Sequence, residues 1–355
     1  MDRIAVSGIG IVSPRAFGRA AFLRTLSLDP GKDPALRVPE FALEQYLETA
    51  RSFRRVADAT KFALASMALA IGDAGFPTAD FGGERAGLVV GISHGAVTYA
   101  VEFHRTLLLE GPLPASPLHF AESVPNAPAG NGAIAFRICG PVHTLIGEEP
   151  VGTQAVDLAA SLLYDGFVDR CLVAGTEEWN EVVAHAYAQM DHARRDGQDA
   201  GDPPALSDGA AALVLELESA VAGRGATPHA VIAGWHVGRC LANSIADATA
   251  DAICAACGPT GHRAAEADHV VSPTGRHRRA ACRGIVAARG GAARPPEWID
   301  LLPVLGNPMG ASNLFQVAAS AALISDGALD GPGLVVSTGI QRTLAAAVLS
   351  AAERA

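Results

Sequence analysis

Two short segments carry side chains that could act as a nucleophile or as an acid–base pair. Residues 91–95 read Gly-Ile-Ser-His-Gly, which matches the G-x-S-x-G turn that presents a serine nucleophile between a strand and a helix. A hydrolase of this kind needs an acid and then a histidine later in the chain. The last histidine is His277, and none follows it in the C-terminal stretch. A Ser93 hydrolase is therefore kept as an alternative, and a structural turn is the favoured interpretation.

The second segment places two adjacent carboxylates, Glu148 and Glu149, directly after a predicted strand over 142–146. A helix is expected to begin near Gly152, and carboxylates close to a helix N-terminus are stabilised by its N–H groups and its dipole. Two such groups could serve as a general acid and a general base. Adjacent side chains in a turn more often point in different directions, so the pattern favours a structural role in which one of them caps the helix.

Patterns that could bind a metal or a nucleotide are weak in this sequence. Cys254 and Cys257 form a lone C-x-x-C with only His262 nearby, whereas a structural zinc site needs four ligands. In segment 8–13 a serine stands where a dinucleotide-binding turn has its third glycine. We therefore expect neither a metal nor a cofactor. The basic segment 276–279 is interpreted as the solvated start of a helix, with docking of an acidic partner as the alternative.

The composition narrows the class of protein. Lys and Arg number 27 against 37 Asp and Glu, which gives a net charge of −10, and 49% of the residues are hydrophobic. The apolar content excludes a disordered protein, and the acidic balance argues against nucleic-acid binding. Apolar runs such as 344–349 are far shorter than the roughly 20 residues of a membrane span. No signal peptide is visible, and the six scattered cysteines are typical of reduced thiols, so we predict a cytoplasmic protein.

The candidate residues must be positioned by an α/β framework. Short β-branched runs alternate with longer stretches rich in alanine and leucine, as in proteins whose helices cover a buried sheet. A strand opens each half of the chain, near Ile4 and near Val231, which indicates a loose internal duplication. The predicted strands span 4–12, 86–90, 142–146, 170–174, 212–216, 231–237, 269–272 and 333–337. The predicted helices span 55–73, 99–110, 152–165, 245–257 and 312–326.

Several stretches resemble the β-ketoacyl-ACP synthases of the thiolase fold. Residues 121–131 read Ala-Glu-Ser-Val-Pro-Asn-Ala-Pro-Ala-Gly-Asn, which is similar to the segment that leads up to the nucleophile of these enzymes. Residues 207–216, Ser-Asp-Gly-Ala-Ala-Ala-Leu-Val-Leu-Glu, resemble the family's glycine-alanine strand. The resemblance implies an α/β thiolase fold with five layers, α-β-α-β-α. It also implies two pseudo-repeated halves, 1–217 and 218–355, within one compact body.

The residues of this family that carry the chemistry are replaced here. The nucleophilic cysteine of the family lies three residues before a small residue, here Gly152, so its position falls on Glu149. Pro273 takes the place of the first catalytic histidine and Asn307 that of the second, while Leu302 replaces the supporting lysine. A condensing enzyme needs a thiolate to hold the acyl chain and imidazoles to stabilise the enolate. The resemblance therefore implies a chain without catalytic residues of its own for condensation.

Residues 147–152, Gly-Glu-Glu-Pro-Val-Gly, resemble the corresponding frame of the chain-length factors of type II polyketide synthases, which commonly carry glutamine at the cysteine position. This resemblance implies a heterodimer with an active ketosynthase, which also receives an acyl carrier protein and its phosphopantetheine-bound acyl chain. Glu149 would be a structural plug, bonded at the helix N-terminus or across the interface. A malonyl-ACP decarboxylase is the alternative, although a charged Glu149 would repel the malonyl carboxylate. A self-pairing homodimer is a further alternative.

The same resemblance places a gate on the acyl tunnel. In chain-length factors the gating side chains lie on the helix before a Glu-Gly-Pro turn, here 110–112. An ungapped count places them at Val97, Ala100 and His104. Two small side chains leave room for a long acyl chain, and His104 would be its stop. The alternative is that these residues only pack the helix. Shortened segments after Gly175 resemble those of polyene-forming systems.

Overall fold

A computed structural model describes residues 2–26, 36–192, 205–241, 244–258, 266–273, 277–290, 295–329 and 331–352. The strands are β1 Ile4–Val12, β2 Ala86–Ile92, β3 Val142–Ile146, β4 Arg170–Glu177, β5 Gly209–Leu217, β6 Ala230–Arg239, β7 His269–Val271, β8 Glu297–Ile299, β9 Gly333–Thr338 and β10 Thr343–Ser350. The helices are α1 Arg19–Leu26, α2 Asp58–Asp73, α3 Val97–Leu109, α4 Pro117–Ser123, α5 Ala127–Ala135, α6 Val151–Tyr164, α7 Glu181–His192, α8 Glu218–Gly223, α9 Ile245–Cys257, α10 Arg278–Arg289, α11 Leu302–Leu305 and α12 Ser312–Ser325. Single 3₁₀ turns include η1 Leu43–Gln45, η2 Ala50–Phe53, η3 Thr78–Asp80 and η5 Met309–Ala311.

The strands form two half-sheets that have the same internal order. Along the whole sheet the order is β3-β2-β4-β5-β1-β6-β10-β9-β7-β8. When the strands of each half are counted from its own first strand, both halves read 3-2-4-5-1, and their first strands meet in the middle. The seam is short, because β1 pairs with β6 only over Ile4–Val6 and Ala230–Ile232. The order of the strands repeats from one half to the other, while the division between residues 217 and 218 stays a prediction and falls between β5 and α8.

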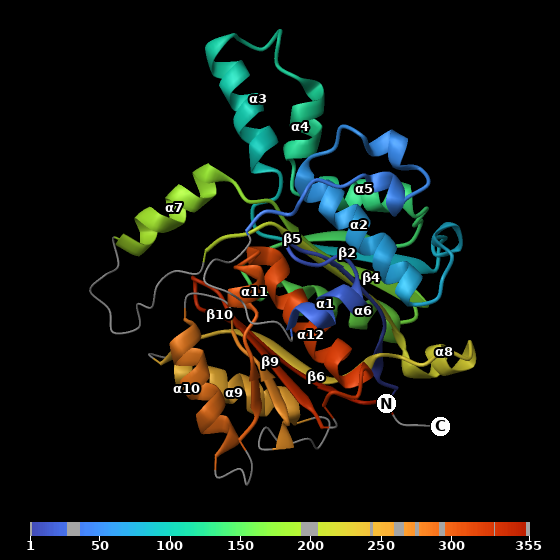
Figure 1. The fold of residues 1–355 in the computed structure, drawn as a ribbon, viewed down its shortest axis with the longest axis vertical. Coiled ribbons are helices and arrows are strands. Elements are labelled where there is room, and N and C mark those ends of the chain that lie inside the picture. The colour runs from blue at the N-terminus through green and yellow to red at the C-terminus, as the bar shows by residue number, and fades with distance from the viewer. Residues whose placement is uncertain are drawn as a thin grey trace.

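Helices cover both half-sheets on both faces. One buried cluster joins α6 and α12 to the inner faces of the two half-sheets, with Val156, Leu314 and Val335 among its members. A second cluster packs α2 and α5 on the outer face of the first half-sheet. A third packs α9 and α10 on the outer face of the second, and Figure 1 shows these two outer pairs on opposite sides of the molecule. The expected α-β-α-β-α thiolase fold is confirmed.

The sequence patterns found the central elements more accurately than the peripheral ones. The strands over 4–12 and 142–146 and the helix over 245–257 have the predicted bounds. Strand β10, with the sequence TLAAAVLS, was not predicted, because three consecutive alanines favour a helix in isolation. It is nevertheless a strand between β6 and β9, and all its residues after Thr343 are buried. Burial between two strands outweighs the local preference of this segment.

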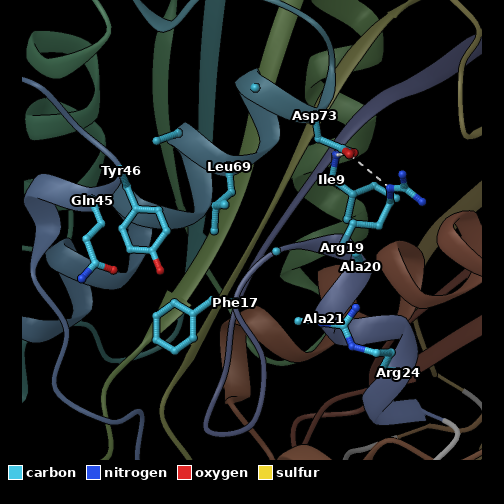
Figure 2. A pocket seen from close by; sticks show the side chains of 13 residues that line it. Ile9, Phe17, Arg19, Ala20, Ala21, Arg24, Gln45, Tyr46, Leu69 and Asp73 are labelled. Carbon is cyan, nitrogen blue, oxygen red and sulfur yellow. Dashed lines mark hydrogen bonds and ion pairs between the residues drawn. The ribbon is translucent and has the colours of Figure 1, made fainter.

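Helices α3 and α4 pack against each other and project from the body as a pair (Figure 1). None of the side chains of α3 is buried, and both helices present large apolar residues to the outside. Further exposed apolar residues lie on α5 and on β3, an edge strand of the sheet. Within the described ranges, no helix has the length and apolar character to cross a bilayer. A separate cavity of about 510 Å³ lies between α1, α2 and η1 (Figure 2).

Candidate functional site

The turn that carries Glu148 and Glu149 connects β3 to α6. The Gly147 N–H donates to the Ile92 carbonyl at 3.0 Å and the Val151 N–H donates to the Glu148 carbonyl at 2.9 Å. These bonds fix the start of α6 against the end of β2. The helix then crosses α12 closely, because a Cβ on Gly152 would approach the Leu314 nitrogen to 2.9 Å. The turn therefore lies where the two halves of the molecule meet.

The two adjacent carboxylates face different partners. The Glu148 carboxylate accepts hydrogen bonds from the Gln341 N–H at 2.8 Å and from the Thr343 hydroxyl at 2.6 Å, both in the second half. Gly339 gives it room, since a Cβ there would lie 2.1 Å from Glu148 Oε2. The expectation that the two side chains diverge is confirmed. The expected helix cap is wrong for both residues, because neither side chain caps the start of α6. The Glu148 carboxylate is held by the C-terminal segment instead.

Glu149 is buried, with 2% of its surface exposed. Its Oε1 accepts a hydrogen bond from the Asn307 amide at 3.4 Å, and its Oε2, although fully buried, has no partner among the described residues. Burial raises the pKa of Glu149 to about 7, and the charge of Glu148 adds to this, while the Asn307 amide lowers it. A carboxyl group in such surroundings is stabilised in its neutral form.

Asn307 is held in place by its own backbone and side chain. Its N–H donates to the Ala205 carbonyl at 2.8 Å, and its carbonyl accepts from the Ser207 N–H at 3.1 Å. Its side-chain oxygen accepts from the Met309 N–H at 3.1 Å. The structure thus brings together the positions that the resemblance assigns to the nucleophile and to the second histidine. The bond that joins them lies within one chain, in the core of the molecule.

The two other positions that the resemblance assigns to catalytic residues, Pro273 and Leu302, make no hydrogen bond with Glu149. Pro273 is buried two residues after β7, where the Ser272 carbonyl accepts from the Gln316 amide at 2.7 Å. Leu302 is the first residue of α11 and is half-buried. Proline has no side-chain donor, and leucine has no polar atom. Neither can replace the proton donor that the resemblance places there.

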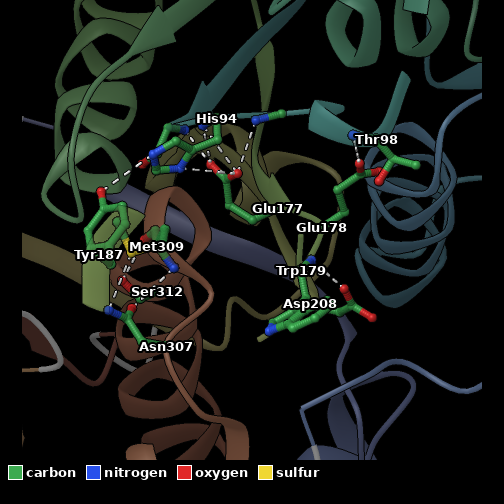
Figure 3. Close-up of polar contacts among 12 residues, drawn as sticks. His94, Thr98, Glu177, Glu178, Trp179, Tyr187, Asp208, Asn307, Met309 and Ser312 are labelled. Carbon is green, nitrogen blue, oxygen red and sulfur yellow. Dashed lines mark hydrogen bonds and ion pairs between the residues drawn. The ribbon is translucent and has the colours of Figure 1, made fainter. Parts of the chain in front are cut away.

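The loop that carries Ser93 has the predicted strand–turn–helix setting, between β2 and α3. Its backbone N–H groups at Ser93, His94 and Gly95 all donate to the Glu177 carboxylate, those of His94 and Gly95 at 3.1 Å (Figure 3). The Ser93 hydroxyl is buried and has no hydrogen-bond partner. A serine nucleophile needs an adjacent base, and no described side chain supplies one. Gly310 packs under this loop, since a Cβ there would lie 2.6 Å from the Ser93 nitrogen.

Glu177 ends β4 and was missed by the sequence interpretation. It is 2% exposed, and burial raises its pKa to about 7, although the Ser93, Gly95 and His94 N–H groups lower it. Its neighbour Glu178 accepts from the Thr98 N–H at 2.8 Å and so holds the first turn of α3. The signal was the same as at 148–149, a pair of carboxylates directly after a predicted strand.

Tyr187 on α7 links this loop to the buried carboxylates. Its hydroxyl lies 3.4 Å from His94 Nε2, and the two rings pack edge to face (Figure 3). Burial raises the pKa of Tyr187, and the charges of Glu149, Glu177 and Glu148 raise it further. Burial lowers the pKa of His94. The directions of both pKa shifts favour the neutral forms of Tyr187 and His94.

The predicted gate residues all lie on α3. Val97 begins the helix, Ala100 follows one turn later and His104 another turn on, so the three share one face. Val97 and Ala100 are half-buried and His104 is exposed, with its Nδ1 2.8 Å from the Ala100 carbonyl oxygen. In the isolated chain this face is open, and the assignment of a gate stays a prediction.

Metal-ligating residues do not gather in the part of the chain that the structure describes: it holds no group of three or more His, Cys, Asp or Glu side chains arranged for a metal ion. Cys254 is exposed and Cys257 is buried, on α9. The third residue considered for that site, His262, lies outside the described residues, as does Arg276 of the basic segment. Arg278 of the same segment pairs with Asp300.

Comparison with known proteins agrees with the fold. Residues 44–220 match the family described as "Beta-ketoacyl synthase, N-terminal domain". A putative polyketide beta-ketoacyl synthase 1 of Streptomyces halstedii is 28% identical over 274 residues, which is 66% of this chain and 62% of that protein. The chain belongs to the ketosynthase (beta-ketoacyl synthase) family. It spans between 47% and 62% of the length of the curated relatives it matches first.

Solved structures show the same fold over the whole chain. The ishigamide ketosynthase/chain length factor has a TM-score of 0.80 and 24% identity, covering 99% of this chain and 100% of that one. A type II polyketide synthase acyl-carrier protein in complex with its ketosynthase has a TM-score of 0.79 and 18% identity, with the same coverage. At these identities the likeness defines the architecture alone: the thiolase fold, which this chain shares with these structures.

Proposed function

We propose that this chain is a non-catalytic ketosynthase-like subunit that pairs with an active ketosynthase and sets the length of the acyl chain in type II polyketide biosynthesis. The observation that carries this proposal is the buried Glu149–Asn307 contact. Condensation needs a thiolate to hold the acyl chain and imidazoles to stabilise the enolate. A buried carboxyl group and an amide supply neither, so a partner has to contribute these groups.

The surface around β3 supports such a partner. Strand β3 is an edge strand of the first half-sheet, so one row of its backbone groups is unpaired within the chain. Ile146 on this strand is 65% exposed, and Leu113 at the tip of the α3–α4 pair is 98% exposed. Exposed apolar patches mark protein interfaces. The exposed large apolar side chains between α3 and β3 in the chain are Val101, Leu108, Leu109, Leu113, Leu118, Phe120, Ile134, Val142 and Ile146.

The structural relatives support the choice of partner and substrate. One is a ketosynthase/chain length factor, and another is an acyl-carrier protein in complex with its ketosynthase. In our proposal the acyl carrier protein delivers its chain to the partner's cysteine. The growing chain then passes along α3, where Val97 and Ala100 leave space and His104 closes the far end.

Co-expression with a ketosynthase encoded beside this chain tests the pairing. We expect a one-to-one heterodimer, measured by size-exclusion chromatography with light scattering. Ile146→Asp places a charge on the β3 edge and should abolish co-purification. The matched control is Val286→Asp on α10, since Val286 is 63% exposed on the opposite side of the fold. A stable homodimer that leaves the ketosynthase unpaired would contradict the proposal, and equal behaviour of the two variants would remove β3 from the interface.

Product analysis of the heterodimer tests the chain-length role. Ala100→Phe fills the proposed path on α3 and should shorten the product by at least one extension unit, with pairing unchanged. His104→Ala should lengthen it. The matched control is Ala188→Phe on α7, outside the proposed path. Unchanged product length in both α3 variants would contradict the gate.

A malonyl decarboxylase is the second candidate, and one observation favours it. Because burial raises the pKa of Glu149 to about 7, a large share of this carboxyl group is neutral near physiological pH. A neutral carboxyl group donates a hydrogen bond as an amide does, so the repulsion of a malonyl carboxylate is weaker than the sequence suggested. Release of CO₂ from malonyl-ACP by the chain alone, lost in Glu149→Ala, would establish this activity.

A further inference from the structure

A cavity of about 510 Å³ lies between the beginning of α1, the end of α2 and η1. None of the replaced catalytic positions and none of the predicted gate residues lines it. Its volume is within the range of small-molecule sites in proteins. The proposed subunit role does not involve this cavity.

The two sides of the cavity differ in chemistry. Phe17, Tyr46 and Leu69 form an apolar side, on which the rings of Phe17 and Tyr46 stack with their centroids 6.1 Å apart. Arg19 and Arg24, from α1, form the other side. Figure 2 shows the aromatic rings and the two guanidinium groups on opposite sides of the space. An apolar wall facing two cations suits a ligand with an apolar body and an anionic head group.

The protein neutralises only part of the charge on the arginine side, because Arg19 pairs with Asp73 and Arg24 does not. Asp73 is the acidic residue of the lining, and its carboxylate already accepts from the Ile9 N–H at 2.9 Å, Arg19 Nε at 3.1 Å and His229 Nε2 at 2.6 Å. Burial acts to raise the pKa of Asp73, but His229, the Ile9 N–H and Arg19 together hold it below its usual value. Arg24 has no hydrogen bond or ion pair with any described residue. Its guanidinium is therefore available to an anion from solution.

Gly72 is an independent sign that the space is kept open. It lies in the last turn of α2 and lines the cavity, and a Cβ built there would meet no atom within 4 Å. Its φ is not positive, so neither the turn nor close packing requires a glycine. A helical glycine costs up to about 1 kcal/mol relative to alanine. Gly72 is exposed, and it leaves this part of the lining without a side chain.

We propose that this cavity binds a small amphipathic anion, with a carboxylate head group on Arg24 and Arg19 and an apolar body along Phe17, Leu69 and the ring of Tyr46. Guanidinium groups bind carboxylates through paired, charge-assisted hydrogen bonds. The Tyr46 hydroxyl, whose pKa is raised by burial, stays protonated and adds a donor. Because the chain carries a net charge of −10, attraction at long range is absent and binding depends on these local contacts.

Isothermal titration of the full chain with octanoate tests the proposal, with octan-1-ol as the neutral comparison. We expect saturable binding of octanoate at one site and at least tenfold weaker binding of the alcohol. Arg24→Ala should weaken octanoate binding at least tenfold. The matched control Arg279→Ala removes the same charge from an exposed position on α10 and should bind as the parent chain does. Equal affinities for Arg24→Ala and Arg279→Ala would overturn the proposal, as would the absence of saturable binding.

A pair of substitutions at Gly72 separates binding in the cavity from binding elsewhere. Gly72→Leu projects a side chain into the space and should abolish octanoate binding without lowering the melting temperature. Gly72→Ala adds only a methyl group and should retain binding within about threefold. Octanoate binding that survives Gly72→Leu would place the ligand outside this cavity and overturn the proposal.

Discussion

Glu149 and Glu177 are both buried to the same extent, and burial raises the pKa of both to about 7, yet their surroundings differ. Glu177 accepts hydrogen bonds from the N–H groups of Ser93, His94 and Gly95, and both of its oxygens are used. Glu149 accepts one long bond from Asn307, and its second oxygen has no partner. Burial is thus shared, and the hydrogen bonds distinguish the two residues.

This difference indicates a structural role for the Glu177 carboxylate, whereas Glu149 lies at a position that the resemblance assigns to a catalytic residue. The loop at 93–95 needs Glu177, because its three N–H groups would otherwise be buried without an acceptor. Among the described residues, no group of backbone N–H donors depends on the Glu149 carboxylate as its acceptor. The resemblance assigns this position to the family nucleophile, and here a buried carboxyl group costs stability and accepts a hydrogen bond from one amide.

Replacement of Glu177 by glutamine should have the largest effect on stability. The amide can accept at only one end, and its NH₂ group would face a backbone N–H, so buried donors lose their acceptor. At about 1–3 kcal/mol for each unsatisfied group, we expect a loss of about 3–5 kcal/mol. Chemical denaturation measures it. A loss below about 1 kcal/mol would contradict the structural role of Glu177.

The same replacement at Glu149 should act in the opposite direction and depend on pH. Because the pKa of Glu149 is raised from 4.5 to about 7, the folded chain binds more protons than the unfolded one between these values, and stability falls as pH rises through this window. At about 1.36 kcal/mol per pKa unit, Glu149→Gln should gain up to about 3 kcal/mol at pH 8 and almost nothing at pH 4. Thermal unfolding at both pH values measures the difference. A gain that is equal at pH 4 and pH 8 would show that charge burial is not its cause.

The smallest effect is expected at Ser93, whose hydroxyl has no partner. Ser93→Ala keeps the backbone N–H that binds Glu177, and it removes a buried polar group that is not hydrogen-bonded. Stability should change by less than about 1 kcal/mol, and product formation by the heterodimer should be unaffected. Loss of an ester-hydrolysing activity in this variant would instead revive the hydrolase alternative.

The resemblance assigns Glu149 and Asn307 to two members of one catalytic set, and the structure brings their side chains into contact. The sequence did not predict the role of Glu177, whose loop lies 84 residues earlier and is brought near only by the pairing of β2 with β4. Strand β10 was missed because its three consecutive alanines favour a helix in isolation. The predicted gate residues lie on a face of α3 that a second chain would cover in our proposal. The sequence of one chain therefore does not define the gate.

Glu148 has a consequence for how residue 149 can vary. The turn before α6 is fastened by Glu148 to Gln341 and Thr343, and by backbone bonds at Gly147 and Val151. None of these bonds uses the side chain of residue 149. The scaffold of the site is therefore independent of the residue that would carry its chemistry. In such a scaffold, replacing one residue can remove a nucleophile without disturbing the turn. A condensing enzyme and a non-catalytic partner can therefore diverge on one fold.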